Sequence, residues 1–108
     1  MKRVVWAGSS REELRAFPPE ARREAGFQLS KVEAGNDPDD WKPMPDIGAG
    51  VREIRVRSSD GAFRVIYVTN IGSVVHVLHA FQKKTQKASL LDLRIARQRL
   101  KQVRGDHP

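Results

Sequence analysis

The stretch that decides the fold runs from Val51 to Phe81 and reads VREIRVRSSDGAFRVIYVTNIGSVVHVLHAF. It contains successive runs rich in β-branched and aromatic residues, which are typical of strands. The runs are separated by SSDG and NIG, and both separators contain the residues that tight hairpin turns require. The pattern therefore predicts three consecutive strands that form an antiparallel meander.

The sequence before this stretch predicts one short strand and two helices. The strand is expected over residues 3–7, RVVWA. The first helix is expected to begin at Ser10, with Glu13 three residues later as its capping partner, and to end at Pro18. The second helix is expected over residues 19–35, because it begins with a proline and ends with a glycine.

The C-terminal sequence KASLLDLRIARQRLKQVR predicts a third helix. Leu93, Ala96 and Leu100 recur on one face of it, and Ser89 with Asp92 would cap its start. The element order is then β-α-α-β-β-β-α. This order predicts an α+β fold with a small, mainly antiparallel sheet and helices packed on one side.

A chain of 108 residues has the length of a single domain, so we expect one domain spanning residues 1–108. The segment Asn36–Gly50 is rich in proline, glycine and aspartate, which predicts a long loop pinned by Trp41. Residues 105–108, which include His107, are expected to form a flexible tail.

The chain carries 20 lysines and arginines against 13 acidic residues, a net charge of +7. Such a surface attracts polyanions, so nucleic acid is the leading partner class, and an acidic protein, a membrane surface or a role in solubility would also fit the charge alone. The absence of cysteine excludes a disulfide scaffold and a thiolate nucleophile or metal ligand. The sequence contains neither a signal-peptide segment nor a stretch of membrane-spanning length, so we expect a cytoplasmic protein without membrane contact.

Alternation along the predicted strands indicates which side chains share a face of the sheet. In the first run Glu53, Arg55 and Arg57 share one face, and in the second run Arg64 shares its face with Ile66. An arginine within an apolar run is unfavourable unless its guanidinium finds a partner or water. Arg64 could pair with Glu53 across the hairpin. Alternatively, the four charged residues could form a phosphate-binding patch on a sheet face that the helices leave open.

The third run ends in HAFQKK, which places an aromatic ring beside two lysines. His79, Phe81 and Lys83 share one strand face, and His76 is expected on the other face in a structural role. His79 titrates near neutral pH and could act in catalysis, or it could be a buried core residue. Phe81 could stack on an unstacked RNA base or close the core of the sheet.

The segment after this strand adds further candidates for RNA binding. Lys84, Thr85 and Lys87 are expected either to flank a groove and contact RNA phosphates or to be solvated turn residues. With Arg57 and Phe81 they form the predicted substrate-binding set.

Several stretches of the chain resemble the RelE/ParE toxin superfamily, and specifically its HigB-like, phage-derived branch. They are GVREIRVRS, FRVIYV, VLHAFQKKTQK and ARQRLKQV, of which LHAFQKKTQK is the most specific. Together with the element order, they cover roughly the whole chain. The resemblance implies a RelE-like toxin of a type II toxin-antitoxin system, which enters the ribosomal A site and cuts messenger RNA without a metal or other cofactor.

The resemblance also implies roles for individual residues. Arg64 takes the place of the family's sheet arginine, which contacts the scissile phosphate, and Arg55 matches a basic position on the preceding strand. Lys83 stands where RelE proper has a second catalytic arginine. In this reaction the ribose 2'-OH attacks the adjacent phosphate, so the enzyme must hold the groups in line and stabilise the charge on the phosphoryl oxygens. An arginine offers a rigid fork to phosphate, and a lysine offers a mobile point charge.

The chain departs from RelE proper at two places. Glu53 replaces a basic residue, and a tyrosine of the C-terminal helix is absent. Glu53 could accept the proton of the 2'-OH, or it could only orient the arginines. The predicted catalytic set is Arg64, Lys83, Arg55, Glu53 and His79.

The partners implied by the resemblance are a cognate antitoxin, messenger RNA and the ribosome. The antitoxin is expected to be a helix-turn-helix protein, and operator DNA would be bound only through it. It is expected to dock on the two N-terminal helices and on the basic face of the C-terminal helix.

Two other function classes fit parts of the sequence. A ParE-like toxin that inhibits gyrase would fit the fold and the charge, but it would leave Arg64 and Lys83 without a catalytic task. A non-catalytic, basic nucleic-acid-binding module would need only the positive charge.

Overall fold

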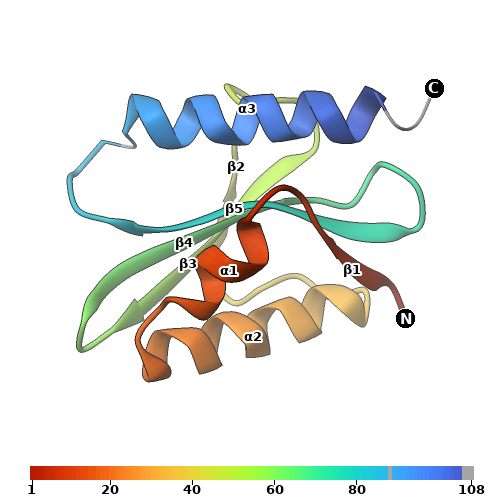
Figure 1. The fold of residues 1–108 in the computed structure, drawn as a ribbon. Coiled ribbons are helices and arrows are strands. Elements are labelled where there is room, and N and C mark those ends of the chain that lie inside the picture. The colour runs from red at the N-terminus through yellow and green to blue at the C-terminus, as the bar shows by residue number, and fades with distance from the viewer. Residues whose placement is uncertain (88, 106–108) are drawn as a thin grey trace.

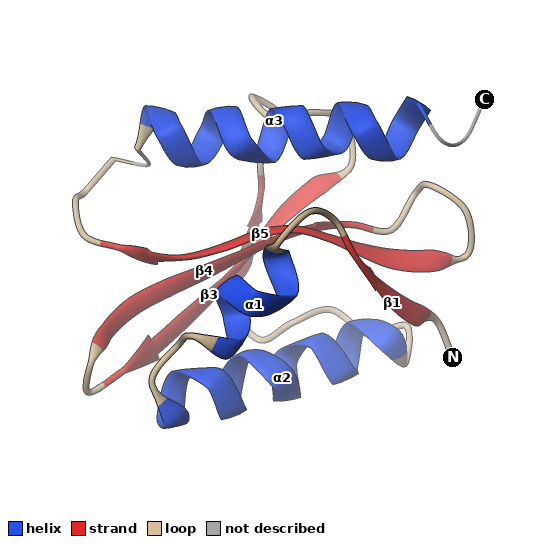
Figure 2. Cartoon of the chain, viewed as in Figure 1, coloured by secondary structure: helices blue, strands red, loops and turns tan. Residues whose placement is uncertain are grey.

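A mixed sheet forms the middle of the molecule (Figures 1 and 2). The computed structural model describes residues 1–87 and 89–105, and within them five strands lie in the order β1-β5-β4-β3-β2. The strands are β1 (Arg3–Trp6), β2 (Trp41–Pro43), β3 (Val51–Ser58), β4 (Gly61–Val68) and β5 (Val74–Lys83). β1 runs parallel to β5, and the other neighbours are antiparallel. The predicted meander is β3, β4 and β5.

The helices are α1 (Ser10–Arg15), α2 (Pro19–Glu33) and α3 (Leu90–Gly105). Figure 1 shows α1 and α2 together below the sheet and α3 running across it above. The α+β class and the predicted order of helices and long strands are confirmed. The expected packing on one side describes α1 and α2, whereas α3 covers a part of the opposite face.

Strand alternation explains why helices are needed on both sides. Residues such as Ile54, Val65 and Val77 point to α1 and α2 and form a core with them. The alternate positions are apolar too at one end of the strands, where Val51 and Leu78 form a separate core with α3. At the other end of that face the alternate positions are charged, and this end carries the candidate site.

The predicted loop Asn36–Gly50 contains a strand that the sequence analysis did not foresee. β2 pairs with β3, with Trp41 opposite Ile54 and Lys42 opposite Glu53. The guanidinium carbon of Arg52 lies 4.0 Å from the centre of the Trp41 ring, so this tryptophan does hold the segment against the sheet. Proline at the end of β2 is tolerated because β2 is an edge strand.

The remainder of this loop is attached to α3. Arg97 donates a hydrogen bond from Nε to the carbonyl of Asp46 at 2.9 Å, and Arg104 donates one to the carbonyl of Ala49 at 3.0 Å. Gly48 lies against α3 so closely that a Cβ there would overlap the Leu100 side chain. These contacts give the loop a fixed position beside the charged end of the sheet.

A bulge corrects the predicted position of His76. The register between β4 and β5 shifts between Ile66 and Tyr67, so Val68 pairs with His76 while Ile66 pairs with His79. Ile66 and Val68 point to the same face, and both histidines therefore do so as well. The expectation that His76 lies on the other face was wrong because the extra residue of a bulge reverses strand parity.

One of the predicted helix caps is confirmed and the other was wrong. At α3, Ser89 Oγ accepts a hydrogen bond from the Asp92 amide at 3.0 Å, as predicted. At α1, the residue before the helix is Ser9, and it makes no side-chain capping bond. Ser10 is buried and donates instead to the carbonyl of Val77 at 3.0 Å, because α1 covers the edge of β5 where β1 ends.

No helix among the described residues is both long and apolar enough to span a membrane. Residues 106–108, and with them His107 and most of the predicted tail, lie outside the described residues.

Candidate functional site

Seven of the ten predicted site residues lie on one face of β3, β4 and β5, in rows that cross the strands. The strand register gives the rows Glu53-Ile66-His79, Arg55-Arg64-Phe81 and Arg57-Ala62-Lys83. Directly opposed side chains in an antiparallel sheet have Cβ atoms about 5 Å apart. The alternation of the sequence therefore gathers the predicted residues at one end of the sheet.

Arg64 and Glu53 form the buried centre of this face. The Nε of Arg64 lies 3.4 Å from Oε1 of Glu53, and the two side chains are 7% and 4% exposed. Arg64 also donates from Nη1 to the carbonyl of Phe63 at 3.0 Å, whereas its Nε makes no hydrogen bond with the residues that the structure describes. Of the two interpretations of Arg64, the pairing with Glu53 is the one that the structure shows. Arg64 is buried and does not lie on an open sheet face, and Arg55 and Phe81 are opposite it on the neighbouring strands.

Arg55 lies opposite Arg64 on the neighbouring strand and is closer to solvent. Its Nε lies 3.8 Å from Oε1 of Glu53, and its Nη1 lies 4.0 Å from Oδ1 of Asp40. About a third of the side chain is exposed. Arg57 lies one row further along the same strand and is exposed. Glu53 thus faces two arginines at once, which supports the alternative that it orients them.

Burial and neighbouring charges lower the pKa of both Arg64 and Lys83. Burial lowers the pKa of Arg64 and outweighs the opposing charge of Glu53, and the charges of Arg55 and Arg57 lower it further. Burial, followed by the charge of Arg64, lowers the pKa of Lys83. We refer to Glu53, Arg55, Arg64 and Lys83 as the charged cluster.

A pocket of about 480 Å³ opens beside the charged cluster. Glu53 and Lys83 line it from the sheet, the segment after β2 forms one wall, and the segment after β5 forms the other. Lys42 and Lys87 add positive charge to its lining. We call it the lysine pocket.

The remaining predicted RNA-binding residues lie around the end of β5. Phe81 is partly buried against the α3 core and lines a smaller cavity of about 240 Å³ with Lys84 and Thr85. The Thr85 hydroxyl donates to the carbonyl of Lys87 at 2.6 Å, which is a turn contact. Phe81 therefore lies between its two predicted roles, since one side packs on the core and another faces the cavity.

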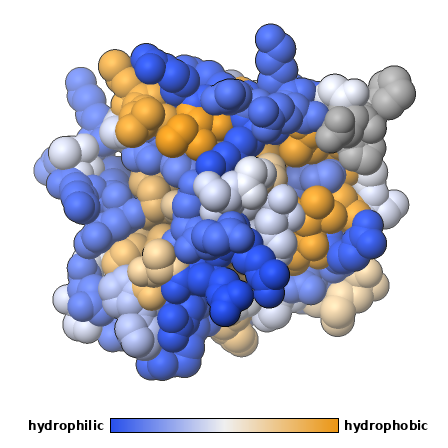
Figure 3. Space-filling model, in the orientation of Figure 1, coloured by the Kyte–Doolittle hydropathy of each residue, from blue (hydrophilic) through white to orange (hydrophobic). Residues whose placement is uncertain are grey.

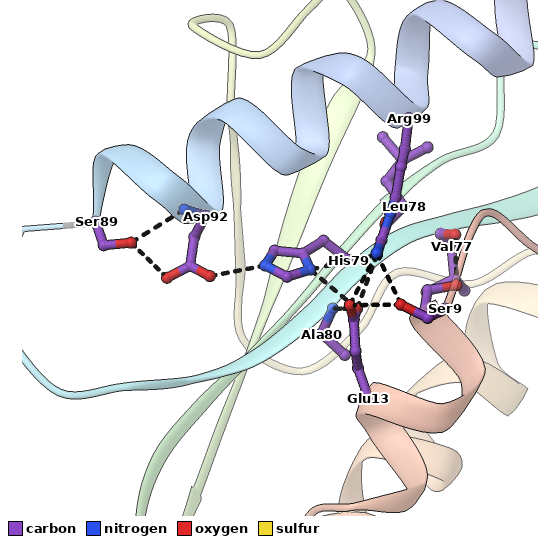
Figure 4. A network of polar contacts seen from close by, with 10 residues as sticks. Ser9, Glu13, Val77, Leu78, His79, Ala80, Ser89, Asp92 and Arg99 are labelled. Atoms are coloured by element: carbon purple, nitrogen blue, oxygen red, sulfur yellow. Dashed lines mark hydrogen bonds and ion pairs between the residues drawn. The ribbon is translucent and has the colours of Figure 1, made fainter.

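His79 lies at the sheet edge between α1 and α3, as Figure 4 shows. Its Nδ1 is 2.9 Å from Oε1 of Glu13, and its Nε2 is 2.7 Å from Oδ1 of Asp92. The centre of the His79 ring lies 5.1 Å from the centre of the Phe81 ring, and the two rings are nearly parallel. Because both ring nitrogens are engaged and the residue is buried, the geometry favours the core interpretation over a catalytic one.

Glu13 connects this histidine to α3. Its carboxylate accepts two hydrogen bonds from the Arg99 guanidinium, each 2.9 Å long, and one from the Ala80 amide. Burial raises the pKa of Glu13, but the hydrogen bonds from Arg99, His79 and Ala80 outweigh it and lower the pKa to about 2. The network fastens α1 and α3 to β5 at His79, next to Phe81 in the rows of the candidate site.

Lys42 and the partners of His79 belong to the site but were not predicted as site residues. Lys42 went unnoticed because β2 was not predicted, so its pairing with Glu53 was unknown. Glu13 precedes His79 by 66 residues. In the sequence, Glu13 stands out only through its spacing from Ser10, which is typical of a helix cap. No local pattern indicates a contact across such a separation.

One comparison with known proteins gives a match. The model of a family described as phage-derived protein Gp49-like (DUF891) matches residues 12–101 of the chain. The matched segment begins in α1, includes β2 to β5 and ends within α3, so it contains every predicted site residue. Among curated proteins, none matches the chain.

Proposed function

Because the chain belongs to the Gp49-like family, a RelE/ParE-like toxin-antitoxin family, we propose that it is a toxin that cuts messenger RNA on the ribosome. The family match covers most of the chain and agrees with the resemblance seen in the sequence. We place the chain in the HigB-like branch on the LHAFQKKTQK stretch, and we propose the cytoplasm as its site of action.

The observation that carries this proposal is the buried Arg64 beside Glu53 and Lys83. A buried guanidinium normally has its N–H groups hydrogen-bonded, yet the Nε of Arg64 makes no hydrogen bond with the described residues. Its pKa and that of Lys83 are lowered, which means that the protein makes their charged forms less favourable than in water. A bound phosphate would relieve both costs. This is the arrangement expected of a site prepared for an anion.

The reaction that fits these groups is an intramolecular transesterification of an RNA phosphodiester, in which the phosphoryl group passes from a 5'-oxygen to a 2'-oxygen. A ribose 2'-oxygen forms a bond to the adjacent phosphorus, and the bond from phosphorus to the 5'-oxygen of the next nucleotide breaks. The products are a 2',3'-cyclic phosphate and a 5'-hydroxyl. The 2'-OH proton passes to water, and the leaving 5'-oxygen takes a proton from water while the positive charge of the Lys83 ammonium group stabilises it.

The arginines stabilise the charge that develops during this step. Arg64 and Arg55 bind the non-bridging phosphoryl oxygens, where negative charge increases in the transition state. Glu53 holds both guanidinium groups through its Oε1. It therefore acts as a positioning residue, and this is the role we favour over proton acceptance.

We propose that an antitoxin of helix-turn-helix type neutralises the toxin by docking on the helices. Exposed apolar side chains on them support this assignment: Phe27 on α2 is 54% exposed, and Leu90 and Leu91 on α3 are 75% and 62% exposed. Figure 3 shows an apolar patch at the upper left, where α3 begins in Figure 1. Contact with operator DNA would then occur only through the antitoxin.

The test is messenger cleavage in a purified translation system, with the cut ends mapped. We expect cuts that carry a 2',3'-cyclic phosphate and a 5'-hydroxyl with the wild-type protein and none with Arg64→Ala. Arg11→Ala, an exposed arginine of α1, is the matched control and should cut normally. Intact messenger together with inhibition of gyrase supercoiling would replace this proposal by the ParE-like function.

A further inference from the structure

The lysine pocket has the size and the walls of a nucleotide site. Its volume of about 480 Å³ falls within the range of small-molecule pockets. Pro43, Met44 and Pro45 form an apolar wall, and Leu93 of α3 lies among the other lining residues. A planar base could pack against such a wall, since apolar side chains commonly hold the faces of unstacked bases.

The pocket's positive charges are not used by the protein itself. The ammonium groups of Lys42, Lys83 and Lys87 make no hydrogen bond or ion pair with any described residue. The ammonium groups of Lys42 and Lys83 repel each other, and this repulsion contributes to the lowered pKa of Lys83. The pocket therefore has a net attraction for phosphate groups.

Asp46 brings a negative charge to this otherwise cationic part of the pocket. It lines the pocket, and its carboxylate likewise makes no hydrogen bond or ion pair within residues 1–87 and 89–105. Its backbone is fixed by the bond from Arg97, and the adjacent Ile47 amide donates to the carbonyl of Met44 at 3.0 Å. The Asp46 side chain is exposed, and its negative charge would repel a phosphate group bound next to it, so Asp46 is suited to a part of the ligand that carries hydrogen-bond donors.

We propose that the lysine pocket binds the nucleotide next to the cleaved bond and that Asp46 selects guanine there. Guanine offers two adjacent N–H donors on its Watson–Crick edge, and a carboxylate accepts two parallel hydrogen bonds. Adenine and uracil each present an acceptor beside a donor, so one carboxylate oxygen would face a lone pair. The position follows from Glu53 and Lys83, which belong both to the pocket and to the charged cluster.

This inference rests on the proposed function for its substrate, but the pocket can be tested without cleavage. The probes are guanosine 5'-monophosphate, adenosine 5'-monophosphate and inorganic phosphate, each titrated into the protein and followed by nuclear magnetic resonance of the backbone amides. We expect guanosine monophosphate to bind about tenfold more tightly than adenosine monophosphate, with shifts at the backbone amides of Lys42, Met44 and Asp46.

Asp46→Asn gives the sharpest comparison. An asparagine side chain presents one acceptor and one donor, which matches adenine, so the preference should fall and turn toward adenosine monophosphate. Asp60→Asn removes the same charge from an exposed turn outside the pocket and should leave the guanine preference unchanged. Equal affinity for both nucleotides, or a preference that survives in Asp46→Asn, would overturn the inference.

Mapped cut sites on messenger RNA separate this inference from the proposed function. Cleavage next to guanine that shifts toward adenine in Asp46→Asn supports both. Cleavage with an unchanged base preference in Asp46→Asn overturns the guanine assignment and leaves the ribonuclease function in place. Selective binding of guanosine monophosphate without any cleavage supports the pocket and contradicts the proposed function.

Discussion

The carboxylate of Glu53 lies 3.4 Å from the Nε of Arg64, and the two side chains lie on neighbouring strands with almost no exposure to solvent. Buried pairs of this kind contribute little net stability, because both ions lose their hydration. Their value is positional. The pair fixes a guanidinium in the middle of a sheet with Arg55 directly opposite it.

Replacing Glu53 by glutamine should destabilise the protein and reduce cleavage. Removing one partner of a buried ion pair leaves Arg64 uncompensated, so the free energy of unfolding should fall by about 3 kcal/mol. Urea denaturation measures this change. Glu33→Gln alters a carboxylate at the end of α2 that makes no hydrogen bond or ion pair with the described residues, and it should change this free energy by less than about 0.5 kcal/mol. Equal stability of both variants would contradict a buried ionic pair.

Lys83 should give cleavage an alkaline limit. Its folded-state pKa is lowered, and the protonated form is the one required, so the rate should decline as pH rises through that lowered pKa. Arginine keeps its charge across this range, so Lys83→Arg should cleave with a rate that stays level from pH 7 to about pH 10. The measurement is the single-turnover rate against pH at saturating toxin. The same alkaline decline in both proteins would assign it to another group.

Lys83 and Lys84 should differ in the step that they affect. Lys83→Ala should lower the single-turnover rate more than the affinity for ribosomes, because its charge meets the developing phosphoryl charge. Lys84 is exposed and lies outside the rows, so Lys84→Ala should mainly weaken binding. Filter binding and single-turnover cleavage separate the two quantities. Equal rates for wild type and Lys83→Ala would reduce Lys83 to a solvated strand end.

His79 should matter for stability and not for the chemical step. His79→Gln loses hydrogen bonds to Glu13 and Asp92, so the free energy of unfolding should fall by about 2 to 4 kcal/mol. The single-turnover rate of the folded variant should remain within a few-fold of wild type. A rate loss of several hundredfold without a change in stability would restore the catalytic interpretation.

Glu13 should make the protein sensitive to acid. Its pKa is lowered from 4.5 to about 2 in the folded state, so its stabilising contribution is present above pH 4.5 and is lost as pH falls toward 2. The stability of Glu13→Gln should therefore lie below wild type near neutral pH and approach it in acid. Urea midpoints between pH 2 and pH 7 test this, with Glu12→Gln as the exposed neighbouring control.

The predictable part of the site is the part that strand alternation controls. The faces of β3 and β4 follow from the two-residue period, and the turn SSDG between these strands places Arg64 opposite Arg55. The Ser89 and Asp92 cap was predictable because it is a local hydrogen bond. Each of these features depends on residues close together in the sequence.

The features that were missed depend on long-range contacts. A bulge in β5 depends on packing of the whole sheet, and it moved His76 to the face of His79. β2 has a short sequence with a proline, and its pairing with β3 is what makes it a strand. The contact of Glu13 with His79 joins α1 to β5 across most of the chain, so no spacing rule applies.

The most direct test of a prepared phosphate site is the single-turnover cleavage of messenger on programmed ribosomes by wild type and Arg64→Lys. Lysine keeps the charge at position 64 but lacks the fork that Glu53 orients. If the site acts as proposed, the wild type leaves 2',3'-cyclic phosphate ends and Arg64→Lys is slower by about a hundredfold or more at equal ribosome binding. Equal rates for the two proteins, or no cleavage by the wild type, would contradict it.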